Sequence, residues 1–220
     1  MKKLNLFILL CFTLIPVSVA KGWNLFKSAH HPKYEQLQTG DIVFQDTGSS
    51  QGEAVTAATG SSFTHCGVVL EKEGRLYVFE AVQPVQLIPL KAWKVRSKIF
   101  HARRLKNTRP LNNDSLLRAI AWGQKQLGKD YDLNFRWSDQ NMYCSELVWK
   151  VYKQATGQQL CAPQTFDSYD LQNTTVLKII QQRYGALENL PKTEFVVAPS
   201  DLANSIFLEE VPRKNQKKQP

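Results

Sequence analysis

The sequence has few of the residues on which metal sites and cross-linked folds depend. Its 220 residues include only four cysteines and four histidines. No C-x-x-C or H-E-x-x-H spacing occurs, so the sequence predicts no metal site and no cofactor. Internal repeats and low-complexity blocks are also absent. A chain of this kind is expected to form an ordinary single domain whose core needs no disulfide or metal cross-links.

Long apolar runs are scarce as well, and the longest lies at the N-terminus. Lys2 and Lys3 precede an apolar stretch over residues 4–15 and small residues at Ser18-Val19-Ala20, the pattern of an export signal. Cys11 lacks the small residues that precede a lipid-modified cysteine. A spanning helix needs about 20 apolar residues, and no later stretch approaches that length. We expect a cleaved signal peptide over 1–20, no transmembrane segment afterwards, and a periplasmic or secreted product.

Positive charge exceeds negative charge but is dispersed along the chain. There are 28 basic and 19 acidic residues, a formal net charge of +9. No nucleic-acid-binding module accompanies the charge, so no nucleic-acid partner is expected. Weak association with an anionic cell-envelope surface is the expectation for an exported protein. Lys94, Arg96 and Lys98 alternate with apolar or small residues, which predicts the exposed face of a strand.

The order of local patterns predicts an α+β fold with a mostly antiparallel sheet and segregated helices. After the signal peptide, residues 21–36 form a lead-in, 37–211 the folded domain and 212–220 a basic tail. Turn residues and alternation predict strands at 42–44, 63–82 (a hairpin around Glu73-Gly74), 98–105 and 194–198. Caps and apolar spacing predict helices at 54–58 (after a Ser50–Glu53 capping box), 113–128, 144–157 and 173–184.

Three cysteines remain once the predicted signal is removed: Cys66, Cys144 and Cys161. Because three is odd, at least one thiol stays unpaired within one chain. Cys144 stands at the front of a helical apolar pattern in NMYCSELVWKVY, where it is either a packing residue, half of a disulfide with Cys161, or a nucleophile. A helix start favours the thiolate, because unpaired N–H groups and the helix dipole stabilise negative charge.

A thiol nucleophile needs a base, and only four histidines are available. His30 and His31 lie in the lead-in, and His101 lies in a basic strand and is expected to be exposed. His65 begins an apolar strand beside a turn. It is therefore the histidine we consider for catalysis, although such a residue is often purely structural.

The hairpin links His65 to an acidic residue. A two-residue loop at Glu73-Gly74 pairs Lys72 with Arg75, which sets His65 and Glu80 diagonally on one face. A loop of three residues would separate them. Glu80 lies among apolar residues, where a carboxylate needs a partner unless it is a solvated edge position.

The same alternation separates the neighbours of His65. Cys66 points to the opposite face, so packing is its expected role. Gly67 lies on the His65 face and, having no side chain, is expected to leave room there for a thiol or substrate.

Several segments occur in the order found in one family: QTGDIVFQ, THCGVVL, YVFEAVQPV with PLKAW, LGKDYD, YCSELVWKVY, QRYG and VVAPS. Over residues 37–211 the chain resembles the permuted branch of the NlpC/P60 papain-like hydrolases, specifically the YiiX-type proteins. The resemblance implies a circularly permuted papain-like fold and a cysteine–histidine–acid triad of Cys144, His65 and Glu80. The N-C-E-H-type motif of the retinol acyltransferase-like branch is absent, since Y-C-S-E stands there. Tyr131 and Tyr143 flank the nucleophile segment and are assigned to the substrate pocket.

The resulting expectation is an exported cysteine amidase or peptidase. It would cleave an amide or ester bond in cell-wall peptides or in acyl or aminoacyl derivatives, with a small-molecule, peptide or acyl-lipid substrate. Two alternatives remain open at this point. One is a non-catalytic lipid- or peptide-binding module on the same scaffold, and the other is a structural envelope protein with a Cys144–Cys161 disulfide.

Overall fold

The computed structural model describes residues 36–97, 99–107 and 111–213. The predicted signal peptide, nearly all of the lead-in and most of the basic tail lie outside these ranges, as do His30 and His31. Within the described ranges, no helix is both long and apolar enough to span a membrane.

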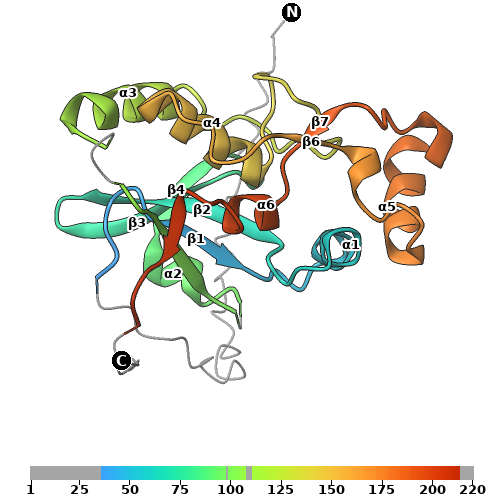
Figure 1. Ribbon diagram of the computed structural model, residues 1–220, viewed down its shortest axis with the longest axis horizontal. Coiled ribbons are helices and arrows are strands. Elements are labelled where there is room, and N and C mark those ends of the chain that lie inside the picture. The colour runs from blue at the N-terminus through green and yellow to red at the C-terminus, as the bar shows by residue number, and fades with distance from the viewer. Residues whose placement is uncertain (1–35, 98, 108–110, 214–220) are drawn as a thin grey trace, which may run out of the picture.

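A six-stranded sheet forms the centre of the molecule (Figure 1). Its strand order is β4-β3-β2-β1-β5-β8, and every pair of neighbours is antiparallel. A separate two-stranded sheet pairs β6 with β7. The bounds are β1 Ile42–Gln45, β2 His65–Lys72, β3 Arg75–Glu80, β4 Gln86–Pro89, β5 His101–Leu105, β6 Gln164–Thr165, β7 Phe195–Val196 and β8 Leu208–Glu210.

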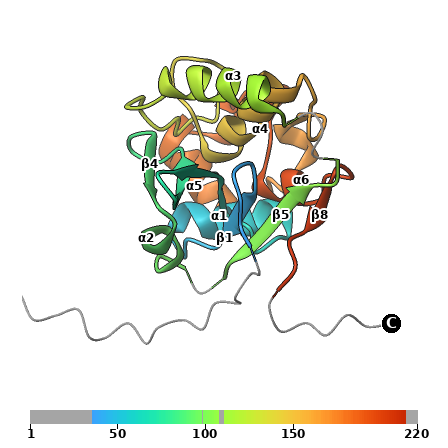
Figure 2. The same ribbon diagram turned by 90° about the vertical axis from the view of Figure 1, so that its left-hand side faces the viewer.

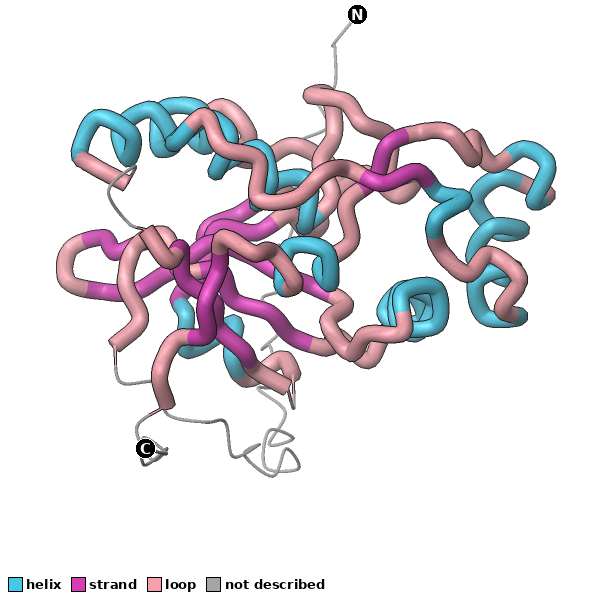
Figure 3. The backbone as a smooth tube through the Cα atoms, viewed as in Figure 1, coloured by secondary structure: helices cyan, strands magenta, loops and turns pink. Residues whose placement is uncertain are grey.

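The helices surround the sheet and do not alternate with its strands (Figure 3). In Figures 1 and 2, α4 with α3 beyond it covers one face, α2 lies against the other, and α1 and α5 stand together beside the sheet. The fold is thus the predicted α+β arrangement. The bounds are α1 Ser50–Thr59, α2 Leu90–Lys94, α3 Asn113–Gln124, α4 Cys144–Thr156, α5 Thr174–Tyr184 and α6 Pro199–Ala203, with 3-10 turns at Phe166–Ser168 and Leu187–Asn189.

Strand alternation divides the core into two layers. Val68 and Phe79 pack beneath α4 with Leu147 and Val148. Val69 and Val78 face the opposite side, with Trp93 of α2 and Phe100. Because both faces are covered, β1 is buried along its whole length, and so are the first residues of β2. Strands buried on both faces hold rigidly whatever side chains project from their ends.

Helix ends follow the predicted signals in most places. α4 begins at Cys144 and stops at Gly157, and α5 stops at Gly185, both glycines being left-handed as C-caps require. The N-caps of α1 and α3 each lie one residue or more before the predicted position. Ser49 accepts from the Gly52 N–H, and Asn112 accepts from the Ser115 N–H.

One strand prediction is wrong. The basic alternation at 94–98 is not a strand, because Lys94 ends the short helix α2 and β5 begins only at His101. Lys98 lies outside the described residues. Trp93, fully buried at 0% exposure, anchors α2 against the sheet, and this packing overrides the local alternation.

Candidate active site

The register of the β2–β3 hairpin brings His65 and Glu80 together. Lys72 pairs with Arg75 across the two-residue turn, as predicted, and Val68 pairs with Phe79. His65 Nε2 lies 2.7 Å from Glu80 Oε2, and both side chains are buried. Because Nε2 is engaged with the carboxylate, Nδ1 is the ring nitrogen left for a third group.

The Glu80 carboxylate accepts from three further donors. Trp93 Nε1 donates to Oε2 at 2.8 Å, while Gln86 Nε2 and Arg96 Nη1 donate to Oε1 at 2.9 and 2.7 Å. Burial alone would raise the pKa of Glu80, but the hydrogen bond and charge of His65, with Gln86 and Arg96, lower that pKa to about 2. Glu80 is therefore ionised at neutral pH and cannot turn, since each oxygen is held by two donors.

Cys144 is the first residue of α4, and local contacts fix that helix start. The Glu146 carboxylate accepts from the Tyr143 N–H at 3.4 Å, and the Ser145 hydroxyl donates to the Val197 carbonyl at 2.6 Å. The Cys144 N–H belongs to the first turn, whose N–H groups have no acceptor within the helix. A negative charge on the Cys144 sulfur, or beside it, therefore meets the positive end of the helix dipole.

The Cys144 thiol and the His65 imidazole shift each other's pKa in opposite directions. The hydrogen bond from Cys66 and the charge and hydrogen bond of His65 hold the pKa of Cys144 well below its usual value, against the opposing effect of burial. Burial lowers the pKa of His65, but the charges of Cys144 and Glu80 and hydrogen bonds to both raise it to about 9. Both shifts favour the thiolate and the imidazolium, the reactive form of a cysteine nucleophile.

Cys66 packs in the core as predicted but also influences Cys144, whereas the open space expected at Gly67 is absent. Cys66 does point to the face opposite Glu80, but α4 packs on that same face, so its thiol meets Cys144 and is more than packing. Burial and then the nearby Cys144 thiolate raise the pKa of Cys66, which stays a thiol and donates. The space above Gly67 is not open either. A Cβ there would lie 2.5 Å from a Val78 methyl and 2.8 Å from the Phe79 carbonyl oxygen.

The remaining candidates lie away from this cluster. The described cysteines, Cys66, Cys144 and Cys161, are all free thiols, so the structure contains no Cys144–Cys161 disulfide. Cys161 lies in the loop after α4, where its carbonyl accepts from Trp149 Nε1 of that helix. His101 is only half-buried, and its Nδ1 lies 3.1 Å from Arg213.

Tyr131 and Tyr143 both lie beside Cys144 but in different roles. Tyr131 forms a parallel bridge with Met142, which sets its ring next to the start of α4. Tyr131 and Cys144 line the same pocket, and burial and the charge of Cys144 both raise the pKa of the Tyr131 hydroxyl. The Tyr143 ring is buried, and its oxygen accepts from the Val197 N–H at 3.2 Å, so Tyr143 mainly fastens α4 to the segment before α6.

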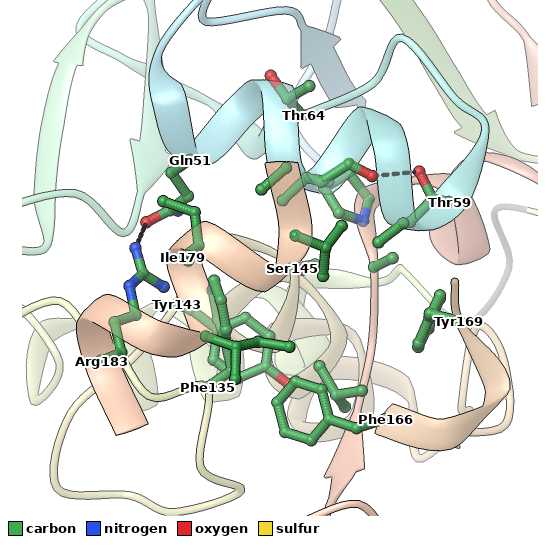
Figure 4. A pocket seen from close by; sticks show the side chains of 18 of the residues that line it. Gln51, Thr59, Thr64, Phe135, Tyr143, Ser145, Phe166, Tyr169, Ile179 and Arg183 are labelled. Carbon is green, nitrogen blue, oxygen red and sulfur yellow. Dashed lines mark hydrogen bonds between the residues drawn. The ribbon is translucent and has the colours of Figure 1, made fainter. Parts of the chain in front are cut away.

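A pocket opens from Cys144 between α1, α5 and the segment 196–199 (Figure 4). In Figure 4 the labelled aromatic rings of Tyr143, Phe135 and Phe166 line its floor, with Ile179 on the α5 side. Among the lining residues, all in the described part of the chain, Arg183 is the one Arg, Lys, Asp or Glu. The lining is otherwise mostly apolar, including Val55, Leu171, Val176, Ile180 and Leu190.

Residues 36–211 match the family described as permuted papain-like amidase enzymes of the YaeF/YiiX type, C92. The chain belongs to this family. It is therefore of the permuted papain-like fold and of a cysteine amidase class, as the ordered motifs implied.

Two relatives agree with this assignment. The chain is 37% identical over 181 residues to the uncharacterized protein YiiX of Escherichia coli K12, covering 81% of this chain and 88% of that protein. It is 38% identical to YiiX of Escherichia coli O157:H7, whose crystal structure superposes with a TM-score of 0.75 over 81% of this chain and 98% of that one. That crystal structure is described as one of a metalloprotein.

The residues of this family member do not fit a metal site. In the described ranges, no three or more His, Cys, Asp or Glu side chains are grouped so that they could hold a metal ion. Glu80, the acidic partner of His65, already accepts two hydrogen bonds at each oxygen. The chemistry below is therefore built from protein side chains alone.

Sequence reasoning missed the residues that support the site. Arg96 was assigned to an exposed strand face, and Trp93 and Gln86 were given no role, although all three hold Glu80. Gln51 and Arg183 also went unnoticed; Gln51 bonds both to Arg183 and to Tyr131 at the pocket. The one available signal was Glu80 itself, since a buried carboxylate requires donors from somewhere.

Proposed function

We propose that this protein hydrolyses an amide or ester bond, with Cys144 as nucleophile, His65 as proton carrier and Glu80 as the group that orients His65. The observation that carries this proposal is the fixed imidazole. Its Nε2 is held 2.7 Å from a carboxylate that four donors immobilise, while its other side meets a thiol of lowered pKa. This is the division of roles in a cysteine–histidine–carboxylate triad.

The reaction takes two steps. The Cys144 sulfur forms a bond to the carbonyl carbon, and the π-electron pair of the C=O bond moves to the oxygen. When the carbonyl re-forms, the bond to the leaving group breaks and His65 gives that group its proton. Water then attacks the thioester, His65 takes a proton from it, and the acid leaves as the Cys144 thiolate is restored.

Two donors are in position for the oxyanion. One is the Cys144 N–H in the first turn of α4, and the other is the Tyr131 hydroxyl beside the sulfur. Burial first, and then the Cys144 charge, raise the pKa of Tyr131 well above its usual value. Tyr131 therefore keeps its proton and acts as a hydrogen-bond donor, without acting as an acid.

The pocket favours an acyl group over a cell-wall peptide. A peptide from the cell wall brings charged amines and carboxylates, whereas beyond the nucleophile Cys144 the described lining offers one charged side chain, Arg183. Arg183 is already bound to the Leu133 carbonyl and to Gln51. An apolar acyl chain gains about 0.8 kcal/mol per buried CH₂ from such a lining. We therefore place the acyl chain of an amide or ester in this pocket.

Export completes the proposal. The charged start, apolar stretch and small-residue site of residues 1–20 support removal of a signal peptide after Ala20. Intact-mass measurement of protein from the periplasmic fraction tests this, since cleavage predicts an N-terminus at Lys21.

Hydrolysis is tested with 4-nitrophenyl acetate, butanoate, octanoate and dodecanoate, and with the matching 4-nitroanilides. We expect kcat/KM to rise steeply from the acetyl to the octanoyl compounds and to vanish in Cys144→Ala. Equal rates for all chain lengths would reject the acyl pocket.

A non-catalytic binding module is the competing function on the same scaffold. It predicts that wild type and Cys144→Ala bind an N-octanoyl amino acid equally well and that neither turns over any compound of the series.

A further inference from the structure

We propose that Gln51 is a positioning residue: backed by Arg183, it holds the Tyr131 hydroxyl as a donor aimed at the oxyanion formed on Cys144. The inference rests on the proposed function for its catalytic meaning. The hydrogen-bond arrangement itself is a property of the free protein and is testable without turnover.

The three residues come from distant parts of the chain. Gln51 lies in the first turn of α1, Arg183 in the last turn of α5, and Tyr131 in the loop before α4. Gln51 Nε2 donates to the Tyr131 oxygen at 2.8 Å, and Arg183 Nη2 donates to Gln51 Oε1 at 2.5 Å. Figure 4 draws the contact between Gln51 and Arg183 at the edge of the pocket.

The donor and acceptor groups of these three side chains fix the direction of each hydrogen bond between them. A guanidinium only donates, so the Gln51 atom facing Arg183 must be the carbonyl oxygen. The Gln51 amide nitrogen must then face Tyr131, and this nitrogen also only donates. The Tyr131 oxygen therefore accepts, and its own hydrogen is left free to point elsewhere. Cys144 lines the same pocket and influences the pKa of this hydroxyl, so we direct the Tyr131 hydrogen toward Cys144.

Arg183 is itself held in place, so the amide of Gln51 cannot flip at low cost. Its Nη1 donates to the Leu133 carbonyl at 2.6 Å, and its guanidinium carbon lies 5.2 Å from the centre of the Phe135 ring. A flipped amide would set two donors against each other at Arg183 and leave a buried donor unsatisfied. Arg183 of α5 therefore fixes the Gln51 amide of α1, and this amide in turn fixes the orientation of the Tyr131 hydrogen.

This arrangement matters most in the tetrahedral intermediate. The carbonyl oxygen gains the electron pair released when the Cys144 sulfur bonds to carbon, and a preset hydroxyl stabilises it without first having to rotate. Tyr131 keeps its proton throughout. Gln51 touches no reacting atom, so its effect must pass through Tyr131.

The test uses Gln51→Glu, which has the same shape and the opposite hydrogen-bonding sense. The new carboxylate accepts from Arg183 and also from the Tyr131 hydroxyl, which turns the phenolic hydrogen away from Cys144. With 4-nitrophenyl octanoate we expect kcat to fall about 10²-fold, the loss typical of one oxyanion donor, with KM little changed. Tyr131→Phe should lose as much, and adding Gln51→Glu to it should cost nothing more.

Two further variants separate orientation from simple contact. Gln51→Met fills the space but leaves the Tyr131 hydroxyl free to rotate toward the oxyanion, so its loss should be smaller than that of Gln51→Glu. Gln124→Glu makes the same charge change at an exposed position of α3 and should keep wild-type kcat. Equal losses in Gln51→Met and Gln51→Glu, or additive losses with Tyr131→Phe, would overturn the proposal.

A second measurement keeps this inference separable from the proposed function. The pH dependence of Cys144 alkylation by iodoacetamide reports the thiolate in the free protein. Gln51→Glu should move its midpoint upward more in the wild-type background than in Tyr131→Phe, because only the former loses a hydroxyl donor. An equal movement in both backgrounds refutes the positioning role. A wild type that alkylates normally but hydrolyses no ester refutes the hydrolase and leaves the hydrogen-bond result standing.

Discussion

The substitution Glu80→Gln removes a buried charge while keeping the shape of the side chain. Glu80 Oε2 accepts from His65 and Trp93, and Oε1 accepts from Gln86 and Arg96. An amide supplies only one accepting oxygen. Gln86 can turn its own amide and Arg96 is partly exposed, so we expect the new NH₂ group to replace Oε1. His65 then keeps its partner and its place, but loses the negative charge beside it.

The magnitude follows from the pKa of His65. Its value of about 9 against an ordinary 6.5 corresponds to about 3 kcal/mol in favour of the imidazolium, the net result of burial, which opposes it, and of Cys144 and Glu80, which favour it. If Glu80 supplies about 1.4 kcal/mol of it, Glu80→Gln changes the ionisation constant of His65 tenfold. The stability cost should be about 1–3 kcal/mol, the usual cost of mismatched buried donors.

The assay is the pH profile of kcat/KM for octanoyl 4-nitroanilide, whose anilide nitrogen must take a proton before it can leave. The alkaline limb marks loss of the His65 proton, because the leaving group needs an acid. In wild type it should lie near pH 9, and in Glu80→Gln it should move toward neutrality while the rate at the maximum falls. An alkaline limb that stays in place would mean that Glu80 does not set the pKa of His65, and the triad reasoning would fail.

Other expectations concern the thiols, the pocket and acid stability. Cys144→Ala should abolish hydrolysis yet change unfolding free energy by only about 1–2 kcal/mol in urea titrations; a larger loss would indicate a packing role. Cys66→Ala should raise the pH midpoint of Cys144 alkylation because the hydrogen bond from Cys66 is lost, and Cys66→Ser should restore it. No change in Cys66→Ala would mean that Cys66 has only a packing role. Ile180→Ala should reduce the octanoate-to-acetate ratio of kcat/KM several-fold, and exposed Leu117→Ala should not. The pKa of Glu80 is lowered from 4.5 to about 2, so its contribution, at most about 3 kcal/mol, is present above pH 4.5 and is lost toward pH 2; acid titration of unfolding should show this slope in wild type and not in Glu80→Gln.

Features set by neighbouring residues were predictable from the sequence. The two-residue turn at Glu73-Gly74 determines the hairpin register, and that register alone brings His65 and Glu80 to one face. The start of α4 at Cys144 and its end at Gly157 follow from apolar spacing and a C-cap glycine. Neighbouring residues in the sequence could not predict the face of the sheet on which Cys144 lies. α4 packs on the Cys66 face because its apolar stripe matches Val68 and Phe79, which is a tertiary choice.

The support of Glu80 was unpredictable for the same reason. Arg96 belongs to a basic alternation that suggests a solvated strand, yet it follows α2 and its Nη1 lies 2.7 Å from Glu80. Trp93 decides this, because burying its ring forces the segment into a helical turn against the sheet. The prediction for Gly67 failed because it expected space where there is none. Its missing side chain indicated open space, but the neighbouring strand already fills that space with Val78.

The charges of the site explain why both faces of the sheet contribute to it. Two buried anions, the Cys144 thiolate and the Glu80 carboxylate, would be costly without matching cations. If His65 were the only cation, its single positive charge would have to balance both anions. Arg96, supplied from the α2 face, neutralises Glu80 and leaves the positive charge of His65 available to the thiolate on the α4 face. At a strand end that is buried on both faces of the sheet, an imidazole can contact one anion from each side. The site therefore depends on the position of His65 as the first residue of β2.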